Sequence, residues 1–233
     1  MGPFVAFLVL AGNAKSLIGA SAVPAAWWPG LTASVLLLAV VLIWARAGPR
    51  LSLGDMGLRR AGTLRAGSLG GLLALAAALA AVAVLRFPPL LDESIRYAPL
   101  RDLPTGALLL RVFPFMLVDT VVLEELAFRG VLFPWLLRGG SLARAVLLSS
   151  AAFTLWHIVV VFAALEGTNL HADPLHHALG ALGAFAAVFA GGAAFALLRA
   201  RTGHLAAPLA AHWTFNAVIL LGLELPGEGT RHE

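Results

Sequence analysis

The chain has 233 residues, of which 60% are hydrophobic and only 12% are charged. Because a water-soluble domain carries about a quarter charged residues, this composition excludes a soluble globular fold and makes lipid the solvent for most of the chain. The net charge of +4 comes from arginines at the ends of apolar runs, which excludes a clustered nucleic-acid-binding face, and the absence of cysteine excludes disulfides, thiolate metal sites and a cysteine nucleophile.

Long apolar runs follow one another along the chain. A helix that crosses a bilayer needs about 20 mainly apolar residues, and about seven runs approach or exceed this length. The sequence therefore predicts an all-α polytopic membrane bundle of about seven transmembrane helices. The predicted spans cover residues 4–23, 29–46, 67–86, 105–137, 142–164, 176–199 and 203–224. Asn13 and Lys15 interrupt the first of these spans.

The arginines between the spans predict how the chain is oriented in the membrane. The connections 46–65, 138–144 and 199–201 carry arginines, whereas the 165–175 loop has none. Positively charged loops stay on the cytoplasmic side, so we expect these basic connections and the N-terminus to lie inside. Seven alternating spans would then place the C-terminus outside.

Ionisable residues crowd the predicted span 105–137, although such groups cannot face lipid. They are Arg111, Asp119, Glu124, Glu125 and Arg129. At about 100° per helical residue, Glu125 and Arg129 share a face and are predicted to pair, while Glu124 points elsewhere and is free for a cavity. Asp119 is expected either to line this cavity or to pair with Arg111. A purely structural ion-pair network is the alternative interpretation, but buried charge in a bilayer is costly and favours a functional one.

Two later spans add imidazole and amide groups. His157 follows Phe153 by one helical turn, and His212 and Asn216 share one face of the last span. Packing and interhelical hydrogen bonding are the alternative roles for these side chains. A buried carboxylate beside an imidazole can deprotonate water, and imidazole N–H and amide NH₂ groups can stabilise an oxyanion. Together with Glu124, these residues supply the groups that amide hydrolysis requires.

The order of the motifs resembles a known family. The chain has neither a G-x-S-x-G nor an H-E-x-x-H motif. Instead, E-E-x-x-x-R at 124–129, F-x-x-x-H at 153–157 and H-x-x-x-N at 212–216 lie on separate apolar spans. With the lead-in Gly-His-Leu-Ala-Ala-Pro at 203–208 and the glycine pair at 191–192, this order resembles the CAAX protease and bacteriocin-processing (CPBP, or Abi) family of intramembrane endopeptidases. The similarity covers about residues 100–220.

The resemblance implies a helical membrane fold with an active-site cavity between the spans. It implies that Glu124 and His157 activate water, while His212 and Asn216 stabilise the oxyanion. Glu125, Arg129 and Phe153 would support this site. The chain then divides into N-terminal spans with a basic cytoplasmic connection (1–66), an intramembrane protease core (67–225) and a tail (226–233).

Metal dependence has two possible readings. Glu124, His157 and His212 could form a zinc site with an open position. We expect a glutamic-type mechanism that requires no cofactor, because asparagine is a poor zinc ligand and a good oxyanion donor. A second metal site is conceivable in the loop at 165–177, although a solvated loop is the default interpretation. The residues concerned there are His171, Asp173, His176 and His177.

The predicted function is endopeptidase hydrolysis near the ends of membrane-tethered proteins, acting on a CAAX-type tail, a C-terminal sorting helix or a leader peptide. The expected partners are the bilayer and a tethered protein or peptide, without nucleic acid, and the expected location is the bacterial inner membrane. The alternatives are a non-catalytic immunity or scaffold protein and a small proton-coupled transporter. The sequence shows no inverted repeat of the transporter kind and retains all four site residues, which disfavours both alternatives.

Overall fold

The computed structural model describes residues 2–19, 27–88, 94–100 and 104–224. This part of the chain is helical and holds no strand, apart from an isolated bridge between Tyr97 and Thr168. The helices of the bundle are α1 (Gly2–Gly19), α2 (Trp27–Ala47), α3 (Thr63–Arg86), the compound helix Thr105–Arg138, α7 (Leu142–Trp156), α8 (Ile158–Glu166), α9 (Pro174–Thr202) and α10 (Ala206–Glu224). The predicted all-α polytopic fold is therefore confirmed.

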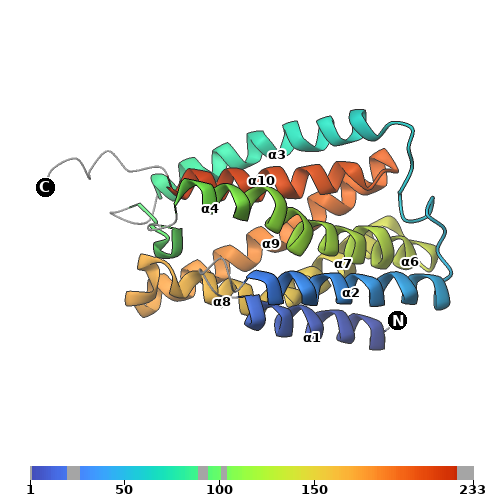
Figure 1. The fold of residues 1–233 in the computed structure, drawn as a ribbon, viewed down its shortest axis with the longest axis horizontal. Coiled ribbons are helices and arrows are strands. Elements are labelled where there is room, and N and C mark those ends of the chain that lie inside the picture. Colours follow the sequence, from blue (N-terminus) through green and yellow to red (C-terminus); the bar gives the residue numbers. More distant parts are fainter. Residues whose placement is uncertain (1, 20–26, 89–93, 101–103, 225–233) are drawn as a thin grey trace, which may run out of the picture.

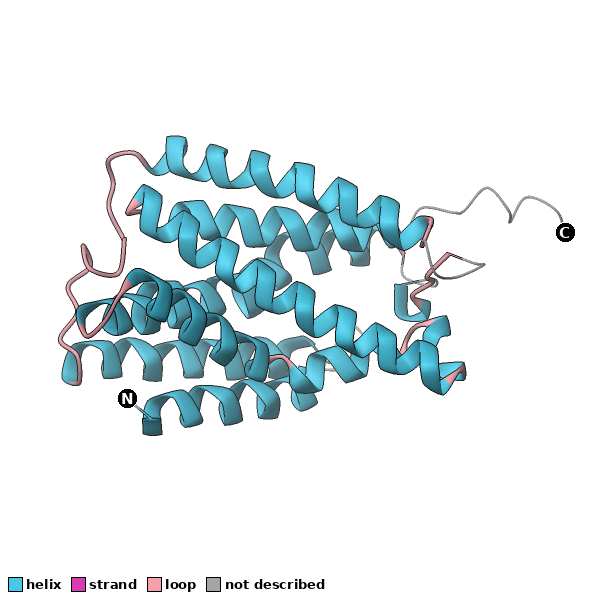
Figure 2. Cartoon of the chain, turned by 180° about the vertical axis from the view of Figure 1, so that it is seen from behind, coloured by secondary structure: helices cyan, strands magenta, loops and turns pink. Residues whose placement is uncertain are grey.

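The helices run roughly along one common direction, and the connections gather at the two ends of the bundle (Figures 1 and 2). α3 packs along α10 on one side, α1 packs along α2 on the other, and α7 and α9 are in contact between them (Figure 1). α3 and α10 approach closely at Gly70, where an added Cβ would overlap the backbone carbonyl of Ala207. Small residues permit such close backbone contact in membrane bundles, where packing drives helix association.

The predicted number of seven spans is not confirmed. Within the described residues, five helices are long and apolar enough to cross a membrane, and six are if α7 and α8 form one broken span. The predicted span 142–164 corresponds to α7 and α8, and it is bent by 47° at this break. The remaining apolar helix, α1, is shorter over Gly2–Ile18, and the end of the predicted span 4–23 lies outside the described residues. The predicted tail 226–233 also lies outside them.

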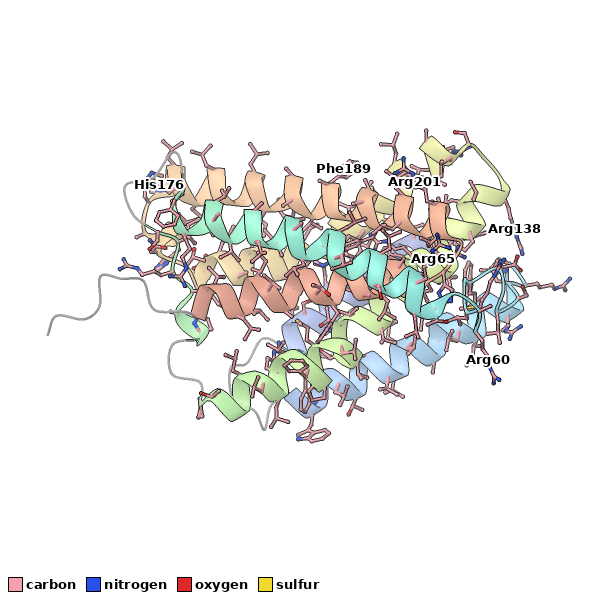
Figure 3. All side chains as sticks on the ribbon, turned by 90° about the horizontal axis from the view of Figure 1, so that it is seen from above. Arg60, Arg65, Arg138, His176, Phe189 and Arg201 are labelled. Carbon is pink, nitrogen blue, oxygen red and sulfur yellow. The ribbon has the colours of Figure 1, made fainter. Side chains whose placement is uncertain are left out.

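Arginines gather at one end of the bundle. Arg60, Arg65, Arg138 and Arg201 all lie at this end, whereas His176 lies at the opposite end (Figure 3). α1 begins at the same end as the connection between α2 and α3 (Figure 1). This clustering agrees with the threading predicted from the charges. Its assignment to the cytoplasmic side remains a prediction.

The connection between α2 and α3 is fastened to the rest of the basic end by polar contacts. The Asp55 carboxylate accepts hydrogen bonds from the Ser52 backbone N–H and from Arg138, at 2.8 and 3.0 Å. The Asp55 carbonyl accepts one from Arg199 of α9 at 2.7 Å. Gly57 has a φ of 76°, and an added Cβ there would overlap the Arg199 guanidinium. A glycine is required at this turn because it combines a left-handed backbone with close contact.

Candidate active site

The compound helix Thr105–Arg138 carries the acidic motif and departs from regular α-helix. It is composed of α4 (Thr105–Leu110), η3 (Arg111–Val122), α5 (Leu123–Glu125), η4 (Leu126–Leu132) and α6 (Phe133–Arg138), of which η3 and η4 are π-helical. Pro114 lies within η3, where its missing N–H interrupts the usual hydrogen-bond ladder. The two glutamates occupy the short α5 between the wider stretches. π-Helical turns are rare and occur frequently at functional sites.

Glu124 lies at the centre of the polar cluster. Its side chain is buried, and Oε1 accepts a hydrogen bond from the Trp156 indole at 3.0 Å. Oε2 lies 3.5 Å from Nε2 of His157 and 3.9 Å from Nε2 of His212, and it has no hydrogen-bond partner. One carboxylate oxygen is thus fixed by Trp156, while the other faces two imidazoles from different helices.

His157 occupies the break between α7 and α8. Its backbone has φ −93° and ψ 6°, in the sparsely populated bridge region where many active-site residues are found. The ring Nδ1 lies 2.7 Å from the carbonyl oxygen of Phe153. Because a carbonyl can only accept, Nδ1 carries the proton, and in the neutral ring Nε2 presents its lone pair to Glu124. The break therefore turns the imidazole toward the carboxylate and sets its tautomer.

Glu125 forms a separate ion pair, as its helical phase predicts. Its Oε1 lies 3.1 Å from Nη1 of Arg129 and 2.9 Å from Nδ1 of His212. Glu125 and Arg129 have no exposed side-chain surface. Arg129 also donates to the carbonyl of Gly192 at 3.0 Å, which links this pair to α9. Glu125 thus orients His212 from behind, while Glu124 faces the other ring nitrogen.

Aromatic rings enclose the charged groups. The Arg129 guanidinium lies 4.1 Å from the centre of the Phe153 ring and 5.3 Å from that of Phe195. Phe153 lies 4.4 Å from the His157 ring, and Phe195 stacks on His212 at 5.1 Å. A desolvated cation over an aromatic face is favourable by about 2 kcal/mol. The two phenylalanines therefore stabilise Arg129 and limit the rotation of both imidazoles.

The structure places Asn216 one turn after His212 on α10, where it is half-buried. Within the described residues, its side chain makes no hydrogen bond, unlike those of the other three predicted catalytic residues. An amide NH₂ group with no other hydrogen-bond partner is free to donate to an oxyanion. Its catalytic role stays a prediction.

Asp119 lies apart from this cluster. Its carboxylate accepts a hydrogen bond from Ser34 of α2 at 2.7 Å and lies 3.4 Å from the ammonium of Lys15 on α1. The charges of Asp119 and Lys15 therefore compensate each other within the apolar part of the bundle. From the sequence we expected Asp119 to line the cavity or to pair with Arg111. Its contact with Lys15 of α1 was not predicted.

The loop residues outside the bundle have structural roles. Asp173 accepts a hydrogen bond from the backbone N–H of His176 and caps α9, and this bond lowers the pKa of Asp173. Among the described residues, no group of three or more His, Asp or Glu side chains is arranged to hold a metal ion, either in this loop or around Glu124. The donor types around Glu124 are those that zinc binds, so whether the site requires a metal stays a prediction.

Trp156 is the site residue that sequence reasoning missed. It stands next to His157 in the F-x-x-x-H motif, and a buried indole N–H needs an acceptor. Two features of the sequence could have pointed to Trp156: its position next to His157 and the presence of Glu124 on the preceding span. The sequence alone could not show that the indole reaches Glu124 rather than a backbone carbonyl.

A carboxylate and two imidazoles thus meet between the spans of a multi-pass helical membrane protein. Residues 106–218 match the family model described as Rce1-like, type II CAAX prenyl endopeptidase Rce1-like. This match confirms the CPBP resemblance for residues 106–218 and supports a CAAX-type intramembrane protease. No curated protein and no solved structure gives a significant match.

Proposed function

We propose that the chain hydrolyses peptide bonds near the ends of membrane-tethered proteins by a metal-independent glutamate mechanism. The observation that carries this proposal is the convergence of Glu124 Oε2 with Nε2 of His157 and of His212. These atoms come from α5, the α7–α8 break and α10. Their separations are too long for direct hydrogen bonds, and a water molecule can bridge groups at such distances.

The proton arrangement follows from the outer partners of the two rings. Nδ1 of His157 donates to a carbonyl and Nδ1 of His212 to the Glu125 carboxylate. Neutral rings would therefore direct two lone pairs at the Glu124 carboxylate, so three acceptors would face one another. A proton on His212 Nε2 relieves this conflict and balances the two glutamates against Arg129 and His212. In this state His157 is the neutral ring.

In the proposed reaction, Glu124 takes a proton from water while neutral His157 accepts the second water hydrogen in a hydrogen bond. The water oxygen attacks the scissile carbonyl carbon and forms a tetrahedral oxyanion. His212 Nε2–H and the Asn216 amide donate to this oxyanion. Glu124 then passes the proton to the leaving nitrogen, the C–N bond breaks, and a carboxylic acid and an amine are released.

The substrate would be a tethered chain end that reaches the site from the bilayer. A prenylated CAAX-type tail, a C-terminal sorting helix and a leader peptide all have this property. The family match favours the first of these classes. We propose a bacterial inner membrane as the location, because the apolar helices and the cluster of arginines at one end of the bundle suit a plasma-membrane-type bilayer.

The test is cleavage in proteoliposomes, with the wild-type chain and each of the three substrate classes. Glu124→Gln, His157→Ala and His212→Ala are expected to lower kcat about 10³-fold or more, because each removes a group that meets the reacting water or oxyanion. Glu166→Gln at the exposed end of α8 and His171→Ala on the loop that follows are the matched controls and are expected to keep wild-type rates. Full activity of Glu124→Gln would overturn the mechanism.

A chelator experiment separates the zinc alternative. Under the proposed mechanism, cleavage continues after treatment with a strong chelator and is unaffected by added zinc. Loss of activity that zinc alone restores would replace the metal-independent mechanism with a zinc-dependent one on Glu124, His157 and His212.

A further inference from the structure

Asn13 of α1 contacts the backbone on both sides of His157. Its Nδ2 donates to the carbonyl of Leu155 at 2.9 Å, and its Oδ1 accepts from the N–H of Val159 at 2.8 Å. Nδ2 also donates to the carbonyl of Val9, one turn earlier on α1, at 2.8 Å. The side-chain orientation is unambiguous, because a backbone carbonyl can only accept and a backbone N–H can only donate.

These two backbone groups would bond each other in an unbroken helix. An α-helix joins the N–H of each residue to the carbonyl four residues earlier, so Val159 would donate to Leu155. The Asn13 carboxamide stands between them and supplies one donor and one acceptor in place of that bond. A side chain inserted into the helical ladder is a recognised cause of sharp bends, and the bend here is 47°.

Gly12, the preceding residue of α1, contacts the other half of the site. It is buried against Trp156, and an added Cβ would overlap the indole ring. The same indole donates to Glu124 Oε1. One turn of α1 therefore contacts Trp156, which bonds the Glu124 carboxylate, and the backbone on both sides of His157.

The position of α1 is itself held by polar contacts. Lys15, two residues beyond Asn13, pairs with Asp119 of η3 at 3.4 Å. Asp119 is also bound by Ser34 of α2. These contacts set the depth of α1 along the bundle and so keep Asn13 level with the α7–α8 break.

We propose that Asn13 is a positioning residue for the protease. Its carboxamide stabilises the break between α7 and α8 and thereby holds His157 at the distance from Glu124 that water activation requires. This inference rests on the proposed function. It also extends that function to α1, which lies outside the segment 106–218 that matches the family. The reactive groups are thus aligned by a helix that carries none of them.

The kinetic test compares Asn13→Leu, Asn13→Gln and the control Leu10→Ala in proteoliposomes. Leucine has a similar size but cannot bond either backbone group, so kcat is expected to fall about 10- to 100-fold, with KM changed less than about threefold. Glutamine keeps the carboxamide and is expected to recover part of the rate. Leu10 is 71% exposed toward lipid on the same helix, and its variant is expected to behave as wild type.

The structural test measures the bend directly. The chain has no cysteine, so labels can be placed singly on α7 and α8, at Leu142 and Val160, which are both exposed. Pulsed electron–electron resonance in lipid is expected to show one narrow distance distribution with Asn13. With Asn13→Leu, the distribution should broaden or shift to longer distances as the helix straightens. Asn13→Ser, whose hydroxyl can donate and accept but reaches less far than the carboxamide, is expected to give an intermediate distribution.

The outcomes separate this inference from the proposed function. A wild-type chain that cleaves none of the substrates counts against the proposed function, while the distance measurement still decides the role of Asn13. An unchanged distribution in Asn13→Leu would overturn the inference. So would a variant that is less thermostable in detergent but keeps wild-type kcat in its folded fraction, because Asn13 would then act only on stability. If Asn13→Leu does not fold, the same criteria apply to Asn13→Ser.

Discussion

The segment 106–218 and the N-terminal helices α1 and α2 contribute to the site in different ways. The segment holds the carboxylates, imidazoles and amide of the proposed reaction, whereas α1 and α2 hold none of them. Yet Gly12, Asn13, Lys15 and Ser34 contact Trp156, the α7–α8 break and Asp119. Helices outside the catalytic segment can therefore supply the partners for its buried charges and for its broken helix.

The two intramembrane ion pairs give the sharpest form of this comparison. Glu125 and Arg129 lie wholly within the segment and have no exposed side-chain surface. Lys15 and Asp119 join α1 to the segment and retain 12% and 11% exposure. Removing one partner of a fully buried pair leaves an uncompensated charge, so the first pair should be the more costly to break.

Arg129→Met is expected to have the largest effect on stability. It should lower the free energy of unfolding by about 3–5 kcal/mol, because Glu125 keeps a buried charge without its main partner. Thermal unfolding in detergent micelles measures the loss. The double variant Arg129→Met, Glu125→Leu should regain a large part of it, since an apolar replacement of both partners leaves no unpaired charge. Additive losses in the double variant would contradict this account of the pair.

Asn216→Ala is expected to act on catalysis within the same segment. Loss of one oxyanion donor costs about 10²–10³-fold in kcat, and the stability change should be small because the side chain is half-buried. Initial rates in proteoliposomes measure this effect, with Thr214→Ala on the same helix as a control. A kcat within about threefold of wild type would remove Asn216 from the proposed oxyanion site.

Lys15→Met tests the link between the two regions. We expect a loss of about 1–2 kcal/mol, because Asp119 keeps its hydrogen bond from Ser34 but loses a partly screened cation. Lys15→Arg, which retains the charge, is the matched control in the same unfolding measurement. A loss as large as that of Arg129→Met would show that the two ion pairs are equally buried in the membrane.

Asp55→Asn, at the basic end, should have the smallest effect, below about 1 kcal/mol, because its ion pair with Arg138 is exposed. The hydrogen bonds from the Ser52 backbone and side chain, together with Arg138, lower the pKa of Asp55 below its ordinary value of 3.8. Its stabilising contribution is therefore present above about pH 3.8 and is lost as the pH falls through the lower folded value. Unfolding of wild type and variant from pH 7 to pH 3 should show the two curves converging at the acid end.

Helical phase was a reliable guide wherever the partners lie on one helix. The spacing of Glu125 and Arg129 predicted their ion pair, and the one-turn spacing of Phe153 and His157 agrees with the ring contact that the structure shows. Both follow from backbone geometry that is the same in every helix. The all-α membrane fold follows equally directly from apolar run length, because lipid offers the backbone no other partners.

Partners on different helices were out of reach of this reasoning. Asn13 and Lys15 read as interruptions of the first span, and nothing in the sequence pairs them with the α7–α8 break or Asp119. The bend at His157 was missed for a related reason. The run around it has no proline or glycine, and the side chain that interrupts its ladder comes from another helix.

The amino-acid sequence was enough to identify a multi-pass helical membrane protein with an acidic, a histidine and a histidine–asparagine motif on separate spans. These properties depend on local composition and on the helical periodicity within each span. The packed helices were needed to show that Glu124 faces both imidazoles, that Trp156 bonds one of its oxygens, and that Asn13 occupies the break beside His157. Such contacts depend on the depth and rotation of each helix against its neighbours, which packing sets and no single span encodes.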